Sequence, residues 1–265
     1  RKVTINYLGE DGNKLNLEGT ESVTLTDIKK GSYLPSQYRL DLENEYYVAV
    51  ARLNGTELTS ATSSIKIEEL ENMVDYIYYK RRIVTLNYID EFGNPIEGID
   101  SITYRYKKDT KLSLTSTANR KDLSELKYGY VENCTVTSEE CIKNTLSQIN
   151  IAEDTIVNYV YAKYRNITIN YKDVHGNYIE GLAPISLEVE KGKYIYRSTY
   201  DVNLSENNYY LEYITRNGKE ENQTYYQIND EFNEFVFYYG KRSQNTQIHV
   251  STYVEDHEGV YSEFD

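Results

Sequence analysis

The sequence predicts a β-rich α+β protein made of tandem copies of one module, and three observations support this fold class. First, tyrosine dominates the aromatic residues, with 30 Tyr against 5 Phe and no Trp. Tyrosine favours half-buried sheet surfaces because its ring is apolar and its hydroxyl is polar. Second, similar segments recur at intervals of 81 to 83 residues. Third, these segments alternate apolar and polar residues with the period of two that a strand with one buried face requires.

Three copies of the repeat are recognised by their first and last segments. The opening segments are residues 3–7, 84–88 and 167–171. A Gly-Asn pair follows each opening segment and tolerates positive φ, so a tight hairpin turn and an antiparallel second strand are expected. The expected second strands are residues 23–25, 102–104 and 185–189. The closing segments are aromatic strands at residues 76–80, 159–163 and 235–239. Each module is therefore expected to begin and end on a strand.

The middle of each module is expected to hold turns, a hairpin and little helix. A Lys-Gly-x-Tyr segment, or a variant of it, follows the second strand in each copy. The middle hairpins begin with residues 46–53, 130–136 and 209–214. An acidic segment, such as residues 67–72, then leads as a turn or a single helical turn into the closing strand. The total is about five strands per module on the alternation pattern.

The repeat spacing also predicts the domain organisation. The expected modules are residues 1–82, 83–165 and 166–242, followed by residues 243–265 as the start of a truncated fourth repeat or a tail. Tyr253 falls 82 residues after Tyr171, which favours a fourth copy that continues beyond Asp265. The joins between modules contain no Gly/Ser or Pro run, so an elongated and fairly stiff rod is expected.

Charge and hydropathy exclude two classes of partner. The formal net charge is −13, which opposes binding to nucleic acid because such binding depends on Lys and Arg displacing counterions from phosphates. No apolar run approaches the roughly 18 to 20 residues that a membrane-spanning helix requires. We therefore expect a monomer that binds neither nucleic acid nor, in this segment, a membrane.

No catalytic or metal-binding motif is present. His175 lies at a predicted turn, His249 and His257 lie in the tail, and neither G-x-S-x-G nor H-E-x-x-H occurs. Asp11 and Asp90 lie in turns that lack the acidic spacing of a calcium-binding EF-hand loop. We therefore predict that the protein is not an enzyme and has no cofactor and no metal site.

The order of these motifs resembles a known family. An opening strand of the form V-T-I-N-Y, a D-x-x-G-N turn, a K-G-x-Y segment and a closing Y-x-Y-x-K strand resemble the MucBP-type (mucin-binding protein) repeats of Gram-positive bacterial surface proteins. The resemblance implies tandem β-grasp (ubiquitin-like) modules of a secreted or cell-wall-anchored adhesin. A Pro-Gly-Tyr turn common in that family is missing here, so a related internalin-type or other β-grasp repeat stays an alternative.

Two groups of residues are candidate sites. Tyr46 and Tyr47, with their counterparts Tyr209 and Tyr210, are candidates for stacking on sugar rings, although strand alternation places one ring of each pair in the core. The acidic chain is expected to repel sialylated or sulfated mucins within the screening length of roughly 8 Å. Cys134 and Cys141 are candidates for a disulfide that clips a hairpin.

These features lead to one functional hypothesis and two alternatives. The hypothesis is a non-enzymatic, extracellular stalk or adhesin on the bacterial cell surface or cell wall, which contacts host mucin or glycan weakly and repeatedly. The first alternative is a passive spacer that presents another binding domain. The second is a module that binds another surface protein by strand addition at a sheet edge.

Overall fold

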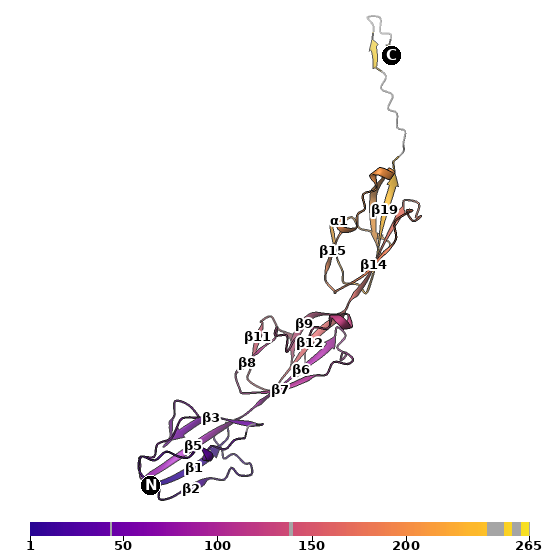
Figure 1. Cartoon of the computed structure of the whole chain (residues 1–265). Helices are drawn as coiled ribbons and strands as arrows, with labels where there is room; N and C mark the ends of the chain where they lie inside the picture. The colour runs from indigo at the N-terminus through magenta and orange to yellow at the C-terminus, as the bar shows by residue number, and fades with distance from the viewer. Residues whose placement is uncertain (43, 138–139, 243–251, 256–260, 265) are drawn as a thin grey trace. The chain divides into compact units, whose positions relative to one another are not determined.

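The computed structural model describes residues 1–42, 44–137, 140–242, 252–255 and 261–264, the last two ranges as backbone only. The chain divides into two compact units, Arg1–Ala162 and Lys163–Asp265. The first unit contains two five-stranded sheets and the second contains one. Figure 1 shows β1 beside β5 in the first sheet and β6 beside β12 in the second. This architecture confirms the β-rich prediction.

All three five-stranded sheets have the same topology. The first runs in the order β2-β1-β5-β3-β4, the second β10-β9-β12-β6-β7 and the third β14-β13-β19-β16-β17. The first sheet consists of β1 (Lys2–Leu8), β2 (Val23–Leu25), β3 (Tyr46–Leu53), β4 (Thr56–Glu57) and β5 (Glu71–Lys80). The second consists of β6 (Arg82–Asp90), β7 (Ile102–Tyr106), β9 (Tyr128–Val136), β10 (Cys141–Lys143) and β12 (Thr155–Lys163). The third consists of β13 (Arg165–Asp173), β14 (Ile185–Val189), β16 (Tyr209–Arg216), β17 (Lys219–Glu220) and β19 (Phe232–Lys241).

The first and last long strands of each sheet pair in parallel at its centre. In the first sheet, β1 and β5 are in register from Lys2 opposite Glu71 to Leu8 opposite Ile77. The same parallel pairing joins β6 to β12 and β13 to β19. Because parallel strands run in the same direction, the chain enters each sheet at one end and leaves it at the other.

The joins between sheets are shorter than the sequence indicated. Only Arg81 separates β5 from β6, and only Tyr164 separates β12 from β13. The strands β6 and β13 begin at Arg82 and Arg165, so each new sheet starts one residue before the boundary predicted from the repeat. The reason is that Arg82 and Arg165 already pair with the neighbouring strand, although the apolar alternation in the sequence begins only after them.

The second strands return antiparallel to the first, but not through tight hairpins. Strands β2, β7 and β14 pair antiparallel with β1, β6 and β13. Gly12, Gly93 and Gly176 have φ of 79°, 87° and 90°, so the Gly-Asn turn does form. A second turn then follows before the return strand, because the segment after Asn13 first makes an isolated bridge from Lys14 back to Leu8.

Each short two-stranded sheet pairs a strand that follows the second strand of the module with a strand that precedes the closing strand. In the second module β8 (Thr110–Ser113) pairs with β11 (Gln148–Ile151), and in the third β15 (Tyr194–Tyr196) pairs with β18 (Tyr225–Gln227). In the first module a single bridge between Tyr33 and Lys66 takes their place. Among the described residues, helix is limited to α1 (Arg197–Tyr200) and to 3-10 turns, namely η1 (Ser36–Tyr38), η2 (Ser124–Leu126) and η3 (Ser205–Asn207). The acidic segments before the closing strands form bends and no helical turn.

The tail contains a small hairpin in which β20 (Thr252–Glu255) pairs antiparallel with β21 (Tyr261–Phe264). The predicted fourth opening strand starts at residue 248, and residues 243–251 and 256–260, with both tail histidines, lie outside the described residues.

A tyrosine at the end of each opening strand explains part of the V-T-I-N-Y motif. Val3, Ile5 and Tyr7 are at most 2 % exposed and form part of the first core. The Tyr7 hydroxyl donates a hydrogen bond to the Tyr38 carbonyl at 2.9 Å. In the other copies Tyr88 donates to the Asn119 carbonyl at 2.7 Å, and Tyr171 makes the equivalent bond at 3.0 Å. Phenylalanine would fill the same space but leave a loop carbonyl without this donor.

A second tyrosine, on each closing strand, also holds this connecting segment. Tyr78 donates to the Leu40 carbonyl at 2.9 Å and Tyr161 donates to the Lys121 carbonyl at 2.7 Å. In the third copy the Tyr239 hydroxyl accepts from the Val202 backbone N–H at 3.0 Å instead. The segment without regular structure is therefore fixed by two hydroxyl groups from the central strands.

We expect Tyr88→Phe to destabilise the second sheet by about 1 to 2 kcal/mol, because the Asn119 carbonyl loses its buried donor. Hydrogen exchange of the β6 and β12 amides under native conditions measures this change locally. Tyr33→Phe is the control, since Tyr33 is 62 % exposed and its change is expected to stay within about 0.5 kcal/mol. Equal effects of the two substitutions would contradict the role of the buried hydroxyl.

Alkaline pH is expected to destabilise the protein. Burial raises the pKa of Tyr88 to about 12 and raises the pKa of Tyr7 and Tyr171, whereas an unfolded tyrosine titrates near about 10. Between these values the unfolded chain binds fewer protons than the folded chain, so stability falls as pH rises. Denaturation midpoints measured from about pH 9 to 12 should decline above about pH 10, less so in Tyr88→Phe. A constant midpoint would refute this expectation.

Candidate functional site

Adjacent tyrosines at the start of β3 and β16 point to opposite faces of their sheets. Tyr46 packs against the first core and Tyr209 against the third. Tyr47 lies on the other face of β3, and Tyr210 on the other face of β16, where it is 42 % exposed. One ring of each predicted pair therefore belongs to the core, as strand alternation requires.

The first and third modules build this region in the same way. Tyr47 lies opposite Tyr79 across the sheet, and Tyr210 lies opposite Gly240. The backbone N–H of Arg81 donates to the Glu45 carbonyl at 2.6 Å, and that of Arg242 donates to the Asn208 carbonyl at 2.7 Å. Each strand also has a register shift, after Val48 and after Leu211. An arginine thus follows the closing strand beside the second tyrosine in both copies.

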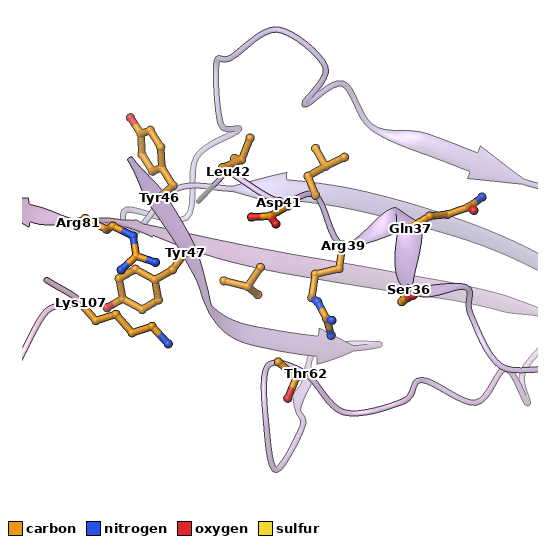
Figure 2. Close-up of a pocket in the computed structure, with 12 residues that line it drawn as sticks. Ser36, Gln37, Arg39, Asp41, Leu42, Tyr46, Tyr47, Thr62, Arg81 and Lys107 are labelled. Carbon is orange, nitrogen blue, oxygen red and sulfur yellow. The ribbon is translucent and has the colours of Figure 1, made fainter. Parts of the chain in front are cut away.

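A groove of about 480 Å³ lies beside Tyr46 and Tyr47, and Figure 2 shows the side chains around it. Its lining combines apolar, hydroxyl and cationic side chains. The residues that line it are Ser36, Gln37, Arg39, Leu40, Asp41, Leu42, Tyr46, Tyr47, Val48, Thr62, Arg81 and Lys107. Sequence reasoning identified only the two tyrosines, because the cations come from segments distant in the chain.

Tyr47 contacts both the first and the second sheet. Arg81 and Lys107 lie 5.7 and 5.4 Å from the centre of its ring, and Figure 2 shows both cations beside it. Tyr79 packs edge-on at 6.0 Å. The Tyr47 hydroxyl accepts a hydrogen bond from the Lys108 backbone N–H at 3.1 Å. Through these contacts Tyr47 connects the first module to the second. Stacking of Tyr47 on a sugar ring stays a prediction.

An ionic cluster completes this joint. The Glu10 carboxylate forms salt bridges with Lys108 at 2.5 Å and with Arg82 at 2.9 Å. The hydrogen bond from Lys108 lowers the pKa of the Glu10 carboxyl, and Arg82 lowers it further. Arg82 also donates to the Ala152 carbonyl at 3.0 Å. The joint between the first two sheets is therefore both aromatic and ionic.

The equivalent groove of the third module differs in charge. It has a volume of about 290 Å³ and is lined by Tyr209 and Tyr210 with Asp201 and Arg242. The Arg242 guanidinium lies 6.0 Å from the centre of the Tyr210 ring. In the second module Gly129, next to Tyr128 at the start of β9, takes the position of the outer tyrosine. The adjacent tyrosine pair is thus present at this position in the first and third modules.

A second group of exposed aromatic side chains lies on the two-stranded sheet of the third module. Tyr194, Tyr196 and Tyr225 are 50, 57 and 51 % exposed. The Tyr194 and Tyr225 rings meet edge-on at 5.5 Å. Their neighbours Ile195 and Tyr226 point into the core, so the sequence alternation Tyr-Ile-Tyr is the signal that identifies this surface.

Cys134 and Cys141 form a disulfide that links β9 to the edge strand β10. Val136 pairs with Cys141 and Lys143 with Cys134 in the strand register, so the bond crosses this pair of strands diagonally. The described residues contain no other cysteine.

The Asp-rich turns use their carboxylates within the backbone. Asp173 accepts hydrogen bonds from the backbone N–H groups of His175 and Asn177 at 2.9 Å each, and Asp90 does the same for Phe92 and Asn94. The side-chain hydrogen bond from Asn177 lowers the pKa of Asp173.

Among the residues that the structure describes, no group of three His, Cys, Asp or Glu side chains has metal-binding geometry. Within the same part of the chain, no helix is both long and apolar enough to cross a bilayer.

Reduction of the disulfide is expected to destabilise the second module by about 2 to 3 kcal/mol, because the closed loop restricts the unfolded chain. The edge strand β10 should lose its hydrogen-exchange protection first, as it is only three residues long. The Cys134→Ser, Cys141→Ser double variant should behave like the reduced protein. Loss of protection in β1 or β13 to the same extent would contradict a local effect.

Comparisons with known proteins give weak similarity. No protein-family model matches the chain, and no curated protein matches it. The solved structure of Streptococcal High Identity Repeats in Tandem (SHIRT) domains 3-4 from a cell surface protein is 12 % identical, with a TM-score of 0.19, over 61 % of this chain and 97 % of that one. The Bacillus anthracis TIE protein is also 12 % identical, with a TM-score of 0.21, over 91 % of this chain and 51 % of that one. The chain thus spans about half the length of the second structure.

Proposed function

We propose that this chain is a non-enzymatic stalk segment of a bacterial cell-surface protein, built from three tandem β-grasp-like modules that transmit tension. The observation that carries this proposal is the parallel pairing of the first and last long strands in every sheet. A pull on the two ends of a module acts along these strands in opposite directions. All the backbone hydrogen bonds between them then resist together.

The length of the parallel pairing supports the proposed load-bearing role. Seven residue pairs join β1 to β5, seven join β6 to β12 and eight join β13 to β19. With a single residue between successive sheets, no flexible linker absorbs the extension before the strands are loaded. The short joins suit a stalk better than a set of independently moving domains.

The strand order supports the proposed β-grasp relationship. The first and last long strands lie together at the centre, with the second strand beside the first and the third beside the last. This arrangement agrees with the fold that the resemblance to MucBP-type repeats implies. The helix that a β-grasp module packs on its sheet is replaced here by 3-10 turns and the two-stranded sheets.

The disulfide supports the proposed extracellular location, since such bonds persist in oxidising compartments.

Binding of host mucin or glycan by the aromatic grooves is the second part of the proposal, and linked weak sites would act through avidity. A passive spacer stays the alternative, because the second module has Gly129 in place of the outer tyrosine. Strand addition at a sheet edge is not favoured in the first module, where the edge strands β2 and β4 have three and two residues.

Force spectroscopy tests the stalk. Pulling the full chain from its two ends should unfold the sheets at a higher force than pulling between residues 45 and 81. Those two positions lie at the same end of the antiparallel β3 and β5 pair, so hydrogen bonds there break one after another. A similar force in both geometries would overturn the load-bearing role and would leave glycan binding to be judged separately.

A further inference from the structure

The groove of the first module has a local charge opposite to that of the whole chain. Arg39, Arg81 and Lys107 line it with Asp41 as the one carboxylate in the lining, while the formal net charge of the chain is −13. Within the described residues, neither Arg39 nor Lys107 is in an ion pair with a carboxylate. At physiological salt, distant carboxylates are screened beyond about 8 Å, so the local cations decide which ligand is attracted.

From this arrangement we propose that the groove binds an anionic saccharide, one that carries a carboxylate or a sulfate. This inference rests on the glycan contact proposed above and names its chemical class. The proposal also differs from the expectation that the acidic chain repels such sugars. That expectation was based on the net charge of the whole chain, whereas the proposal is based on the side chains that line the groove.

The remaining lining suits a sugar rather than a simple ion. Ser36, Gln37 and Thr62 supply hydroxyl and amide groups that donate to and accept from sugar hydroxyls. Leu40 and the half-buried Tyr46 supply apolar surface for the C–H groups of the ring. The volume of about 480 Å³ falls in the range of small-molecule sites.

The cations occupy complementary roles. The planar guanidinium of Arg39 is suited to a bidentate contact with a carboxylate or sulfate. The ammonium of Lys107 is a compact charge on a flexible stem. Arg39 and Thr62 lie at one part of the groove in Figure 2, and Lys107 and Arg81 lie beside Tyr47 at another. A ligand between them would meet positive charge at both ends.

The site is composite, because two sheets contribute to it. Arg39 belongs to the connecting segment of the first module, whereas Lys107 follows β7 of the second. The hydrogen bond from the Lys108 N–H to the Tyr47 hydroxyl and the salt bridge from Lys108 to Glu10 position Lys107 at the groove. The first module on its own would therefore lack one of the cations.

The third module provides a natural comparison. Tyr171 binds the Tyr200 carbonyl as Tyr7 binds the Tyr38 carbonyl, so Asp201 occupies the position of Arg39. A carboxylate thus faces the third groove where a guanidinium faces the first. The third groove is expected to discriminate against the anionic sugars that the first one binds.

The test measures binding of three probes to the full chain by NMR titration: 3′-sialyllactose, a sulfated lactose and neutral lactose. We expect both anionic probes to bind at least about tenfold more tightly than lactose, and binding to weaken as salt rises from about 0.15 M to 0.5 M. Arg39→Asp, which installs the residue of the third module, and Lys107→Gln should each weaken anionic binding about tenfold or more. Lys111→Gln, at an exposed lysine outside the groove, is the matched control and should change nothing. Unfolding of each variant is checked first.

Each other outcome overturns a defined part of the inference. Equal affinity for lactose and the anionic probes would retain glycan contact and refute the anionic class. No binding of any probe would refute both. Anionic binding that survives Arg39→Asp but is lost in a Tyr194→Gln, Tyr225→Gln variant would move the site to the exposed tyrosines of the third module.

Discussion

The parallel pairing of the first and last long strands is the constraint on which each module depends. It places the beginning and end of some 80 residues side by side, so every other strand and loop must be accommodated around this pair. The pairing closes a long loop, and the entropic cost of closure must be offset by apolar burial on one face. Val3, Ile5 and Val74 are fully buried on that face in the first sheet. The same pairing sets the direction in which force passes through the module.

The tyrosine hydroxyl groups extend this constraint to segments without regular structure. Each connecting segment contains only short helical turns of three or four residues, so most of its backbone carbonyls need other donors. Tyr88 and Tyr161 supply two of them from the central strands of the second sheet. This use of the hydroxyl gives a reason for tyrosine in place of phenylalanine at these core positions. It also links the stability of the fold to the titration of buried phenols.

The joint between the first two sheets connects structure to the proposed function. Tyr47, Glu10 and Lys108 hold the two sheets together, and the same contacts bring Lys107 to the groove beside Arg39. The proposed load-bearing joint and the proposed groove for an anionic sugar therefore share residues. The third module lacks the charge pattern of this groove, since Asp201 replaces Arg39. Repetition of a fold thus does not mean repetition of a site.

The sequence by itself determined the repeat, the β-rich class and the rule that one tyrosine of each adjacent pair faces the core, because period-two alternation and turn chemistry are local properties. Only the tertiary structure decided the parallel strand order, which depends on contacts about 70 residues apart, and the partners of Tyr47. The tertiary structure also determined that the groove of the first module carries net positive charge. Net charge sums over the chain, whereas Arg39, Arg81 and Lys107 come from three separate segments that only folding brings together.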